Sequence, residues 1–320
     1  MTADISLASQ PIFLIGAERS GTTVLRLMLD HHPKITFEGE LLQYVFDRMP
    51  IGDGWSQLDQ FYDQFEEWLN LNRISSFTID RRLSYPELVK TFLYQSCASK
   101  GKPIIGVTFH RNFDRLLRIW SDARFIHLIR DGRDVAYSCV GMGWAGNVWS
   151  GVERWIETEK LWTELRDLLS VEQRIEITYE TLISEPSKTL TCLCNFIGVP
   201  YEPAMLSYPQ TTTYNLPDPN LMGKWRHKLS DYEIQLVESK IGNMLVERGY
   251  KLSGLPPVSI NSAIENRLRL QDWWARLGFR IQRNGLTLFL LDYLTRYLGL
   301  KQWQRSVKQK LYAIKQVHCK

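Results

Sequence analysis

The sequence lacks most of the features that mark an exported, membrane-spanning or metal-binding protein. Its five cysteines are odd in number, and their spacing does not form a disulfide framework. Cys192 and Cys194 have no second pair of ligands with them, so we expect no zinc site there. The N-terminus has neither the charged start nor the apolar run of a signal peptide. No segment reaches the roughly 18 uninterrupted apolar residues that a membrane span needs, and we expect a cytoplasmic protein.

Acidic residues are scarce in the last part of the chain. From Lys251 to the end there are 13 Lys/Arg and 3 Asp/Glu, a balance of 13 − 3 = +10. The whole chain carries +4, so the remainder carries 4 − 10 = −6. Such a basic tail suggests an acidic contact, for example a membrane surface or a nucleic acid, and solvated helix faces are the equal alternative. We expect no nucleic-acid partner and leave a peripheral membrane contact open.

Short apolar runs alternate with helical patterns along most of the chain. This order predicts an α/β fold with a parallel sheet covered on both faces. The expected strands are 11–15, 103–109, 124–129 and 173–179. The expected helices are 22–31, 60–70, 86–99, 112–120, one starting near 131, 149–169, 187–197 and 230–248.

The texture changes at 254-GLPPVSIN-261, where two prolines break regular structure. We therefore expect one domain over residues 1–253 and a basic helical extension over 254–320, with helices at 262–283, 285–298 and 300–316. These helices could pack on the domain, form a dimer contact or lie on a membrane. Packing is the commoner outcome for apolar helix faces, and the oligomeric state stays open.

The stretch 15-IGAERSGTT-23 resembles a phosphate-binding loop that lacks its lysine. Gly16 and Gly21 are in place, but Thr22 fills the lysine slot and Arg19 is the only cation. The strand over 124–129 ends at Arg130, where a nucleoside triphosphatase would need an acid for Mg²⁺. The loop therefore suits a single 5′-phosphate that bears one more anionic group. A P-loop kinase or NTPase and a non-catalytic nucleotide-binding module are the alternatives.

Three motifs together carry a resemblance to a known family. The glycine loop is followed by 24-VLRLMLDHHPKITFEGE-40, then by 124-RFIHLIRDGRDVAYS-138 and by 177-ITYETLISEP-186. In this order they resemble the sulfotransferases that use 3′-phosphoadenosine-5′-phosphosulfate (PAPS), above all bacterial members and tyrosylprotein sulfotransferases. The likeness covers roughly residues 10–250 and excludes the basic C-terminal helices. It implies a P-loop-like three-layer sandwich with a central parallel sheet, PAPS as co-substrate and no metal.

The resemblance also assigns residues to the donor nucleotide. The phosphosulfate would be held by the loop residues Arg19, Ser20, Gly21, Thr22 and Thr23. The 3′-phosphate would be held by Arg130 and Ser138. Arg133 is a weaker candidate for that phosphate, since a surface salt bridge with Asp131 or Asp134 explains it as well. Tyr179 would lie near the adenine, or is a core aromatic at a strand end. Lys224, in 223-GKWRHKLS-230, matches a nucleotide-binding lysine of some members.

On the acceptor side, the likeness points to two candidate bases. Glu40 falls 21 residues after Arg19, where tyrosylprotein sulfotransferases place a catalytic glutamate, whereas Glu38 would point to the opposite side of an extended chain. His110, in 106-GVTFHRN-112, matches the histidine of cytosolic members only loosely. The lysine that neighbours that histidine has no counterpart here, and His110 and Arg111 are the candidates to replace it.

The acceptor itself is not readable from the sequence. A hydroxyl or amine is expected, on a small molecule, a lipid, a carrier-bound intermediate or a peptide tyrosine. Two aromatic segments, 141–149 with Trp144 and Trp149 and 51–68, are expected to form the acceptor wall or the core.

Overall fold

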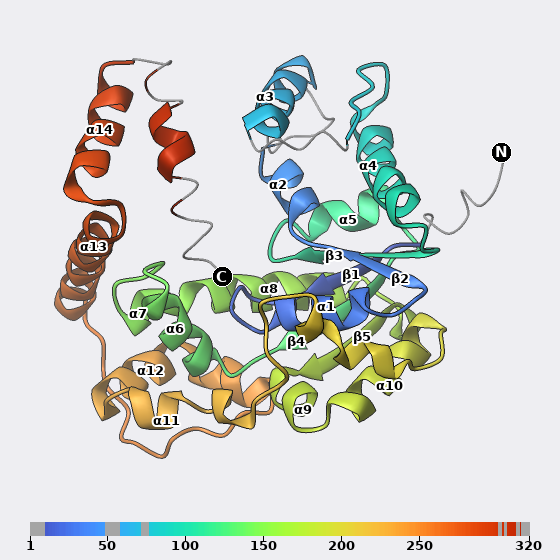
Figure 1. Ribbon diagram of the computed structural model, residues 1–320. Coiled ribbons are helices and arrows are strands. Elements are labelled where there is room, and N and C mark those ends of the chain that lie inside the picture. The colour runs from blue at the N-terminus through green and yellow to red at the C-terminus, as the bar shows by residue number, and fades with distance from the viewer. Residues whose placement is uncertain are drawn as a thin grey trace. The chain divides into compact units, whose positions relative to one another are not determined.

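The computed structural model describes residues 10–48, 58–71 and 77–299, together with 303, 306–311 and 314 (Figure 1). The chain divides into two compact units. The first comprises residues 1–130 and 156–222, and the second comprises residues 131–155 and 223–320. Each unit is described separately below. Residues 1–9, residues 51–57 of the expected acceptor wall and much of the expected helix over 300–316 lie outside the described residues.

The first unit is built on one parallel sheet of five strands. The strands are β1 (Ile12–Ile15), β2 (Ile35–Glu38), β3 (Ile104–Phe109), β4 (Arg124–Ile129) and β5 (Arg174–Thr178), in the spatial order β2-β3-β1-β4-β5. The register pairs Leu14 with Thr108 on one side and with Ile126 on the other. The predicted parallel sheet is therefore confirmed, while β2 was not expected. Its sequence, ITFE, lacks the continuous apolar run that IFLI provides in β1.

Helices cover both faces of this sheet, and each face has its own apolar core. Phe13 and Ile15 of β1 point into one core with α2 (Leu41–Arg48), α3 (Leu58–Leu71), α4 (Tyr85–Lys100), α5 (Asp114–Ile119) and part of α8 (Glu153–Arg166). Ile12 and Leu14 point into the other, with α1 (Thr22–Asp30), α9 (Tyr179–Ser184) and α10 (Pro186–Ile197). This alternation follows from the two-residue period of a strand and explains why the central strands are mostly apolar. Figure 1 shows the two helical layers.

The strand order changes direction at β1. The chain places β2 and β3 on one side of β1, and then β4 and β5 on the other. Open α/β sheets bind ligands at such a switch point, outside the carboxyl ends of the strands. The segments that follow β1, β3 and β4 are the glycine loop, His110 and Arg130. The topology therefore brings three of the predicted motifs to the same edge of the sheet.

The second unit is helical. It contains α6 (Gly132–Gly141), α7 (Val148–Gly151), α11 (Trp225–Lys228), α12 (Asp231–Glu247), α13 (Ser262–Asn284) and α14 (Leu286–Tyr297). The expected single helix over 149–169 is interrupted by a turn at Val152, between α7 and α8. The C-terminal helices over 262–283 and 285–298 are confirmed.

Candidate functional site around the glycine loop

The glycine loop connects β1 to α1 by a backbone that only glycine tolerates at two points. A Cβ on Gly16 would lie 2.6 Å from the carbonyl oxygen of Leu128 in β4, so any other residue would push the strands apart. Gly21 has φ +92°, and a Cβ there would lie 2.4 Å from the Tyr179 ring. Arg19 also has a positive φ, of 74°. This left-handed backbone is uncommon outside glycine and turns the loop sharply before α1 begins.

The start of α1 is suited to an anion. Gly21 is its N-cap, no side chain caps the first turn, and no acidic residue lies there. The first N–H groups of a helix carry a partial positive charge and have no partner within the helix. The hydroxyls of Ser20 and Thr108 are buried and have no hydrogen-bond partner in the part of the chain that the structure describes. Buried hydroxyls normally have one, so both are available to a ligand.

Arg130 follows β4 and lies against the same loop. Its Nη1 donates to the carbonyl of Arg19 at 3.0 Å, and its Nη2 donates to that of Leu221 at 2.9 Å. Its guanidinium lies 4.2 Å from the centre of the Tyr179 ring. Tyr179 is thus buried in the core and also in contact with the loop, and it begins α9 instead of ending a strand. A position in the core and a position near the nucleotide, the two interpretations of Tyr179 from the sequence, therefore do not exclude each other.

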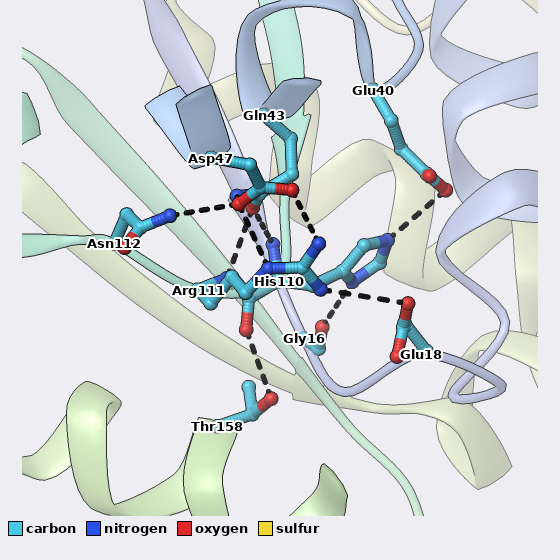
Figure 2. A network of polar contacts seen from close by, with 9 residues as sticks. All are labelled: Gly16, Glu18, Glu40, Gln43, Asp47, His110, Arg111, Asn112 and Thr158. Atoms are coloured by element: carbon cyan, nitrogen blue, oxygen red, sulfur yellow. Dashed lines mark hydrogen bonds and ion pairs between the residues drawn. The ribbon is translucent and has the colours of Figure 1, made fainter. Parts of the chain in front are cut away.

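The two candidate bases contact each other. His110 is buried, and its Nδ1 donates a hydrogen bond to the carbonyl of Gly16 at 2.6 Å. Its Nε2 lies 3.3 Å from Oε1 of Glu40, whose side chain is 61% exposed. This hydrogen bond lowers the pKa of the Glu40 carboxyl below its usual range, against the smaller opposing effect of burial. Figure 2 shows His110 between the loop and Glu40.

A layer of polar contacts fixes the backbone at His110. The Gln43 side-chain oxygen accepts the backbone N–H groups of His110 at 3.0 Å and of Arg111 at 3.1 Å. Thr158 of α8 donates to the carbonyl of His110 at 3.0 Å (Figure 2). Gln43 lies in the first turn of α2, and Glu40 directly precedes this helix, so the candidate base and the clamp on its partner are three residues apart. Sequence reasoning missed Gln43, because nothing in the chain near residue 43 indicates its distant partners.

The other acidic and basic candidates in the first unit have partners of their own. Arg111 binds Asp47 through two nitrogens and lies 3.8 Å from Glu18, so its charge is already compensated. Glu38 forms an ion pair with Lys100 at 3.1 Å. Arg111 and Glu38 are therefore paired outside the contact between His110 and Glu40, and the roles of all four residues stay predictions.

The remaining residues that are predicted to bind the donor nucleotide lie in the second unit. Ser138 is on α6, and Lys224 is the N-cap of α11. The backbone N–H groups on either side of Lys224, at Gly223 and Trp225, donate to Asp134 at 2.7 and 2.9 Å. Asp134 thus orders the segment that carries Lys224, a role that the sequence did not indicate. The roles of Ser138 and Lys224 toward a nucleotide stay predictions.

Arg133, the weaker phosphate candidate, is not at the surface as its alternative reading supposed. It is 1% exposed and forms ion pairs with Asp131 at 2.7 Å and Glu238 at 2.6 Å, and it also lies against the Trp225 ring. Burial and these two carboxylates explain the residue, because a buried cation needs compensation. Trp144 and Trp149 likewise lie against cations of the second unit, Arg154 and Lys240.

A second buried histidine also escaped the sequence analysis. His127, in the middle of β4, has Nε2 3.2 Å from Glu159 and Nδ1 3.2 Å from Glu176. Burial lowers its pKa, but the two carboxylates outweigh this and hold the pKa above the usual value. The ring stacks on Trp162 at 4.4 Å.

Among the described residues, no group of three or more His, Cys, Asp or Glu is arranged to hold a metal ion.

Comparisons with known proteins agree with this architecture. The family model described as "Sulfotransferase family" matches residues 11–203. The chain is 25% identical over 214 residues to a putative protein-tyrosine sulfotransferase of Caenorhabditis briggsae, covering 64% of this chain and 71% of that one. It is 23% identical over 275 residues to protein-tyrosine sulfotransferase 1 of Danio rerio, covering 77% and 74%.

Among solved structures, the chain resembles the sulfotransferase domain from the curacin biosynthetic pathway. The TM-score is 0.56 at 18% identity, with 76% of this chain and 98% of that one covered. At this identity the likeness establishes a shared fold. The matched region contains the glycine loop, Glu40, His110, Arg130 and Tyr179.

Proposed function

The chain belongs to the sulfotransferase family and is a sulfotransferase that takes its sulfuryl group from PAPS, and from this premise we propose a role for each residue at the sheet edge. The lysine that a kinase or NTPase needs is replaced by Thr22, so that alternative is not favoured. The observation that carries the proposal is the contact between the glycine loop, His110 and Glu40.

The first unit has groups that fit a phosphosulfate. The uncapped start of α1, the Arg19 side chain and the unpartnered hydroxyls of Ser20 and Thr108 are the groups that we assign to it. When bound, PAPS supplies a sulfuryl group attached to its 5′-phosphate. As the S–O bond between them breaks, the nucleotide phosphate is the leaving group. Arg19 and the backbone N–H groups would stabilise the charge that grows on the departing phosphate oxygen. A guanidinium can do this at any working pH.

Hydrogen-bond chemistry restricts the protonation of the Glu40–His110 pair. The carbonyl of Gly16 can only accept, so Nδ1 of His110 must carry a proton. The contact between Nε2 and Glu40 then needs a second proton between them, either on the imidazole or on the carboxyl. The lowered pKa of Glu40 favours a carboxylate facing an imidazolium. We therefore propose that Glu40 and His110 act as one pair of opposite charge, in which each residue has its own role.

In this pair we assign the base to Glu40 and a second cation to His110. Glu40 is exposed to an incoming acceptor, whereas His110 is buried against the loop carbonyl. The carboxylate would take the proton of the acceptor hydroxyl or amine as its oxygen or nitrogen bonds to sulfur. The imidazolium would add positive charge beside the loop, in place of the lysine that the sequence lacks.

For the acceptor we propose a hydroxyl or amine on a small, lipid or carrier-bound molecule. A peptide tyrosine is the second candidate, because the relatives from Caenorhabditis briggsae and Danio rerio are described as protein-tyrosine sulfotransferases, the first as a putative one. The compartment that we propose stays the cytoplasm.

An acceptor screen with radiolabelled PAPS tests the reaction and the two roles together. Wild type should label at least one acceptor without added Mg²⁺, Glu40→Gln should lose turnover, and His110→Ala should lose part of it. Full activity of Glu40→Gln would remove Glu40 as the base. A requirement for ATP and Mg²⁺ in place of PAPS would overturn the reaction itself. Tight binding of adenosine 3′,5′-bisphosphate without turnover on any acceptor would favour a binding module.

A further inference from the structure

We propose that α13 and α14 form a docking surface for an anionic membrane. The surface consists of Leu270, Trp273 and Trp274 on α13 with Leu290, Tyr293 and Leu294 on α14, and is called the C-terminal apolar face below. All six side chains belong to the second unit.

One side of α13 packs on the second unit, and it carries both apolar and polar side chains, Phe279 among the apolar ones. Asp272 is buried and accepts the backbone N–H of Gly146 at 2.7 Å. Leu268, four residues earlier on the same side, is also buried, and its carbonyl accepts from Asn147 at 2.8 Å. These contacts fix the rotation of the helix about its axis. They decide which side chains face outward.

The outward side of α13 is apolar. Leu270, Trp273 and Trp274 are 58%, 51% and 59% exposed. With 3.6 residues per turn, they lie on the side of the helix opposite Leu268 and Asp272. A helix that packs on a globular protein normally turns its apolar stripe inward. α13 instead has apolar residues on both sides, so the stripe with Trp273 and Trp274 lies in water and needs a partner.

α14 adds a second apolar stripe. Leu286, Leu290, Tyr293, Leu294 and Tyr297 follow the spacing i, i+4, i+7, i+8 and i+11 of a single helix face. The three central members, Leu290, Tyr293 and Leu294, are 46%, 63% and 48% exposed. Figure 1 shows α14 directly after α13 in the chain. Exposed apolar residues are therefore not scattered singly but gathered on two consecutive helices.

Charge selects the partner of this face. Arg269 and Arg280 lie four and seven residues from Trp273, hence on the same side of α13, and both are exposed. The chain from Lys251 onward carries 13 Lys/Arg and 3 Asp/Glu. Aromatic and leucine side chains bordered by arginine are typical of helices that lie in an anionic membrane interface. A second copy of this chain would bring like charges together, which disfavours self-association.

The contact would be a surface one. No helix in the described ranges is long and apolar enough to cross a membrane. The face would then enter the boundary between head groups and acyl chains, while the arginines pair with lipid phosphates.

Sedimentation of the full chain with vesicles tests this proposal. Wild type should bind vesicles that contain phosphatidylglycerol and bind phosphatidylcholine vesicles far more weakly, with binding falling as salt rises. The double substitution Leu290→Glu with Leu294→Glu should weaken binding to the anionic vesicles by more than about tenfold, since it removes two exposed apolar side chains that would be buried in the membrane interface. Leu168→Glu with Leu216→Glu is the matched control, because both leucines are exposed but lie in the first unit.

Each result of this experiment decides the proposal. Equal melting temperatures of the two double variants would show that the substitutions leave the fold intact. Equal binding of wild type to both kinds of vesicle, or equal loss in the control, would overturn the proposal. Light scattering that shows a dimer abolished by the Leu290 and Leu294 changes, without vesicle binding, would assign the face to a second copy instead.

Discussion

The side-chain oxygen of Gln43 lies 3.0 Å from the backbone nitrogen of His110 and accepts its N–H. The same oxygen accepts the next N–H, of Arg111, while the side-chain nitrogen of Gln43 donates to Asp47 at 2.9 Å. Gln43 is 3% exposed, so water cannot replace these bonds. The position of the imidazole thus depends on a residue of α2, outside the glycine loop.

Gln43→Met keeps the shape of the side chain but removes its acceptor. Two buried N–H groups would lose their partner, and the free energy of unfolding should fall by about 1–3 kcal/mol. Turnover should also fall, with the KM for PAPS less affected, because the imidazole is displaced while the loop stays. Chemical denaturation and steady-state kinetics measure both effects. Gln282→Met, at an exposed position of α13, should change neither. Wild-type turnover in Gln43→Met would show that the clamp does not position His110.

Glu40 and Glu38 offer a matched pair of carboxylates. Glu40→Gln should reduce turnover by roughly 10²–10⁴-fold, the usual contribution of a general base. Glu38→Gln breaks an ion pair with Lys100 and should leave turnover close to wild type. Initial rates at saturating PAPS give the comparison. The reverse order of the two variants would place the base at Glu38.

The pH dependence of the reaction should respond to His110. The hydrogen bond from His110 is the largest cause of the lowered pKa of Glu40. In His110→Ala this cause is gone, so Glu40 should titrate at higher pH and the acidic limb of kcat/KM should move upward. In wild type the carboxylate persists below the usual range, and the stability that it contributes is lost only as pH falls through its folded-state pKa. A limb that stays in place in His110→Ala would contradict the pairing.

His127 makes the stability of the fold depend on pH in the opposite direction to Glu40, because its pKa is raised and that of Glu40 is lowered. Its pKa is raised above 6.5 in the folded chain, so the imidazolium stabilises the fold fully below that value. This stability is lost as pH rises through the folded-state pKa, and melting temperatures should fall across that window. His127→Gln should destabilise the fold by about 3–5 kcal/mol, because Glu159 is left buried without its cation. Its melting temperature should also lose the pH dependence of wild type. Parallel melting curves of variant and wild type across the pH range would refute the role of His127.

Local patterns were enough to predict the sheet and the loop. The apolar runs before Gly16 and Arg130 have the length and the following residues of buried strands, and both are strands in the structure. The fold class follows from their alternation with helices. The strand β2 was missed because its sequence, ITFE, lacks such a continuous apolar run.

Partners far apart in the chain were beyond the sequence. His110 and Glu40 are separated by 70 positions, so the sequence could rank them as rival bases but could not bring them together. The hydrogen bonds of Gln43 to the backbone at His110, and the ion pairs of His127 with Glu159 and Glu176, likewise join residues far apart in the chain. The outward side of α13 also depends on tertiary contacts, because both of its sides carry apolar residues and the pattern alone does not show which side packs inward.

Two consecutive residues of α8 tie together the strands on either side of β1. Thr158 holds the end of β3 through the carbonyl of His110, and Glu159 holds the middle of β4 through His127. Neighbouring positions on one helical turn cannot move apart. They therefore hold β3 and β4 at a fixed separation on either side of β1, where the chain enters the glycine loop. Substitutions in helices far from α8 that change the acceptor preference would then leave the sheet edge at the glycine loop undisturbed.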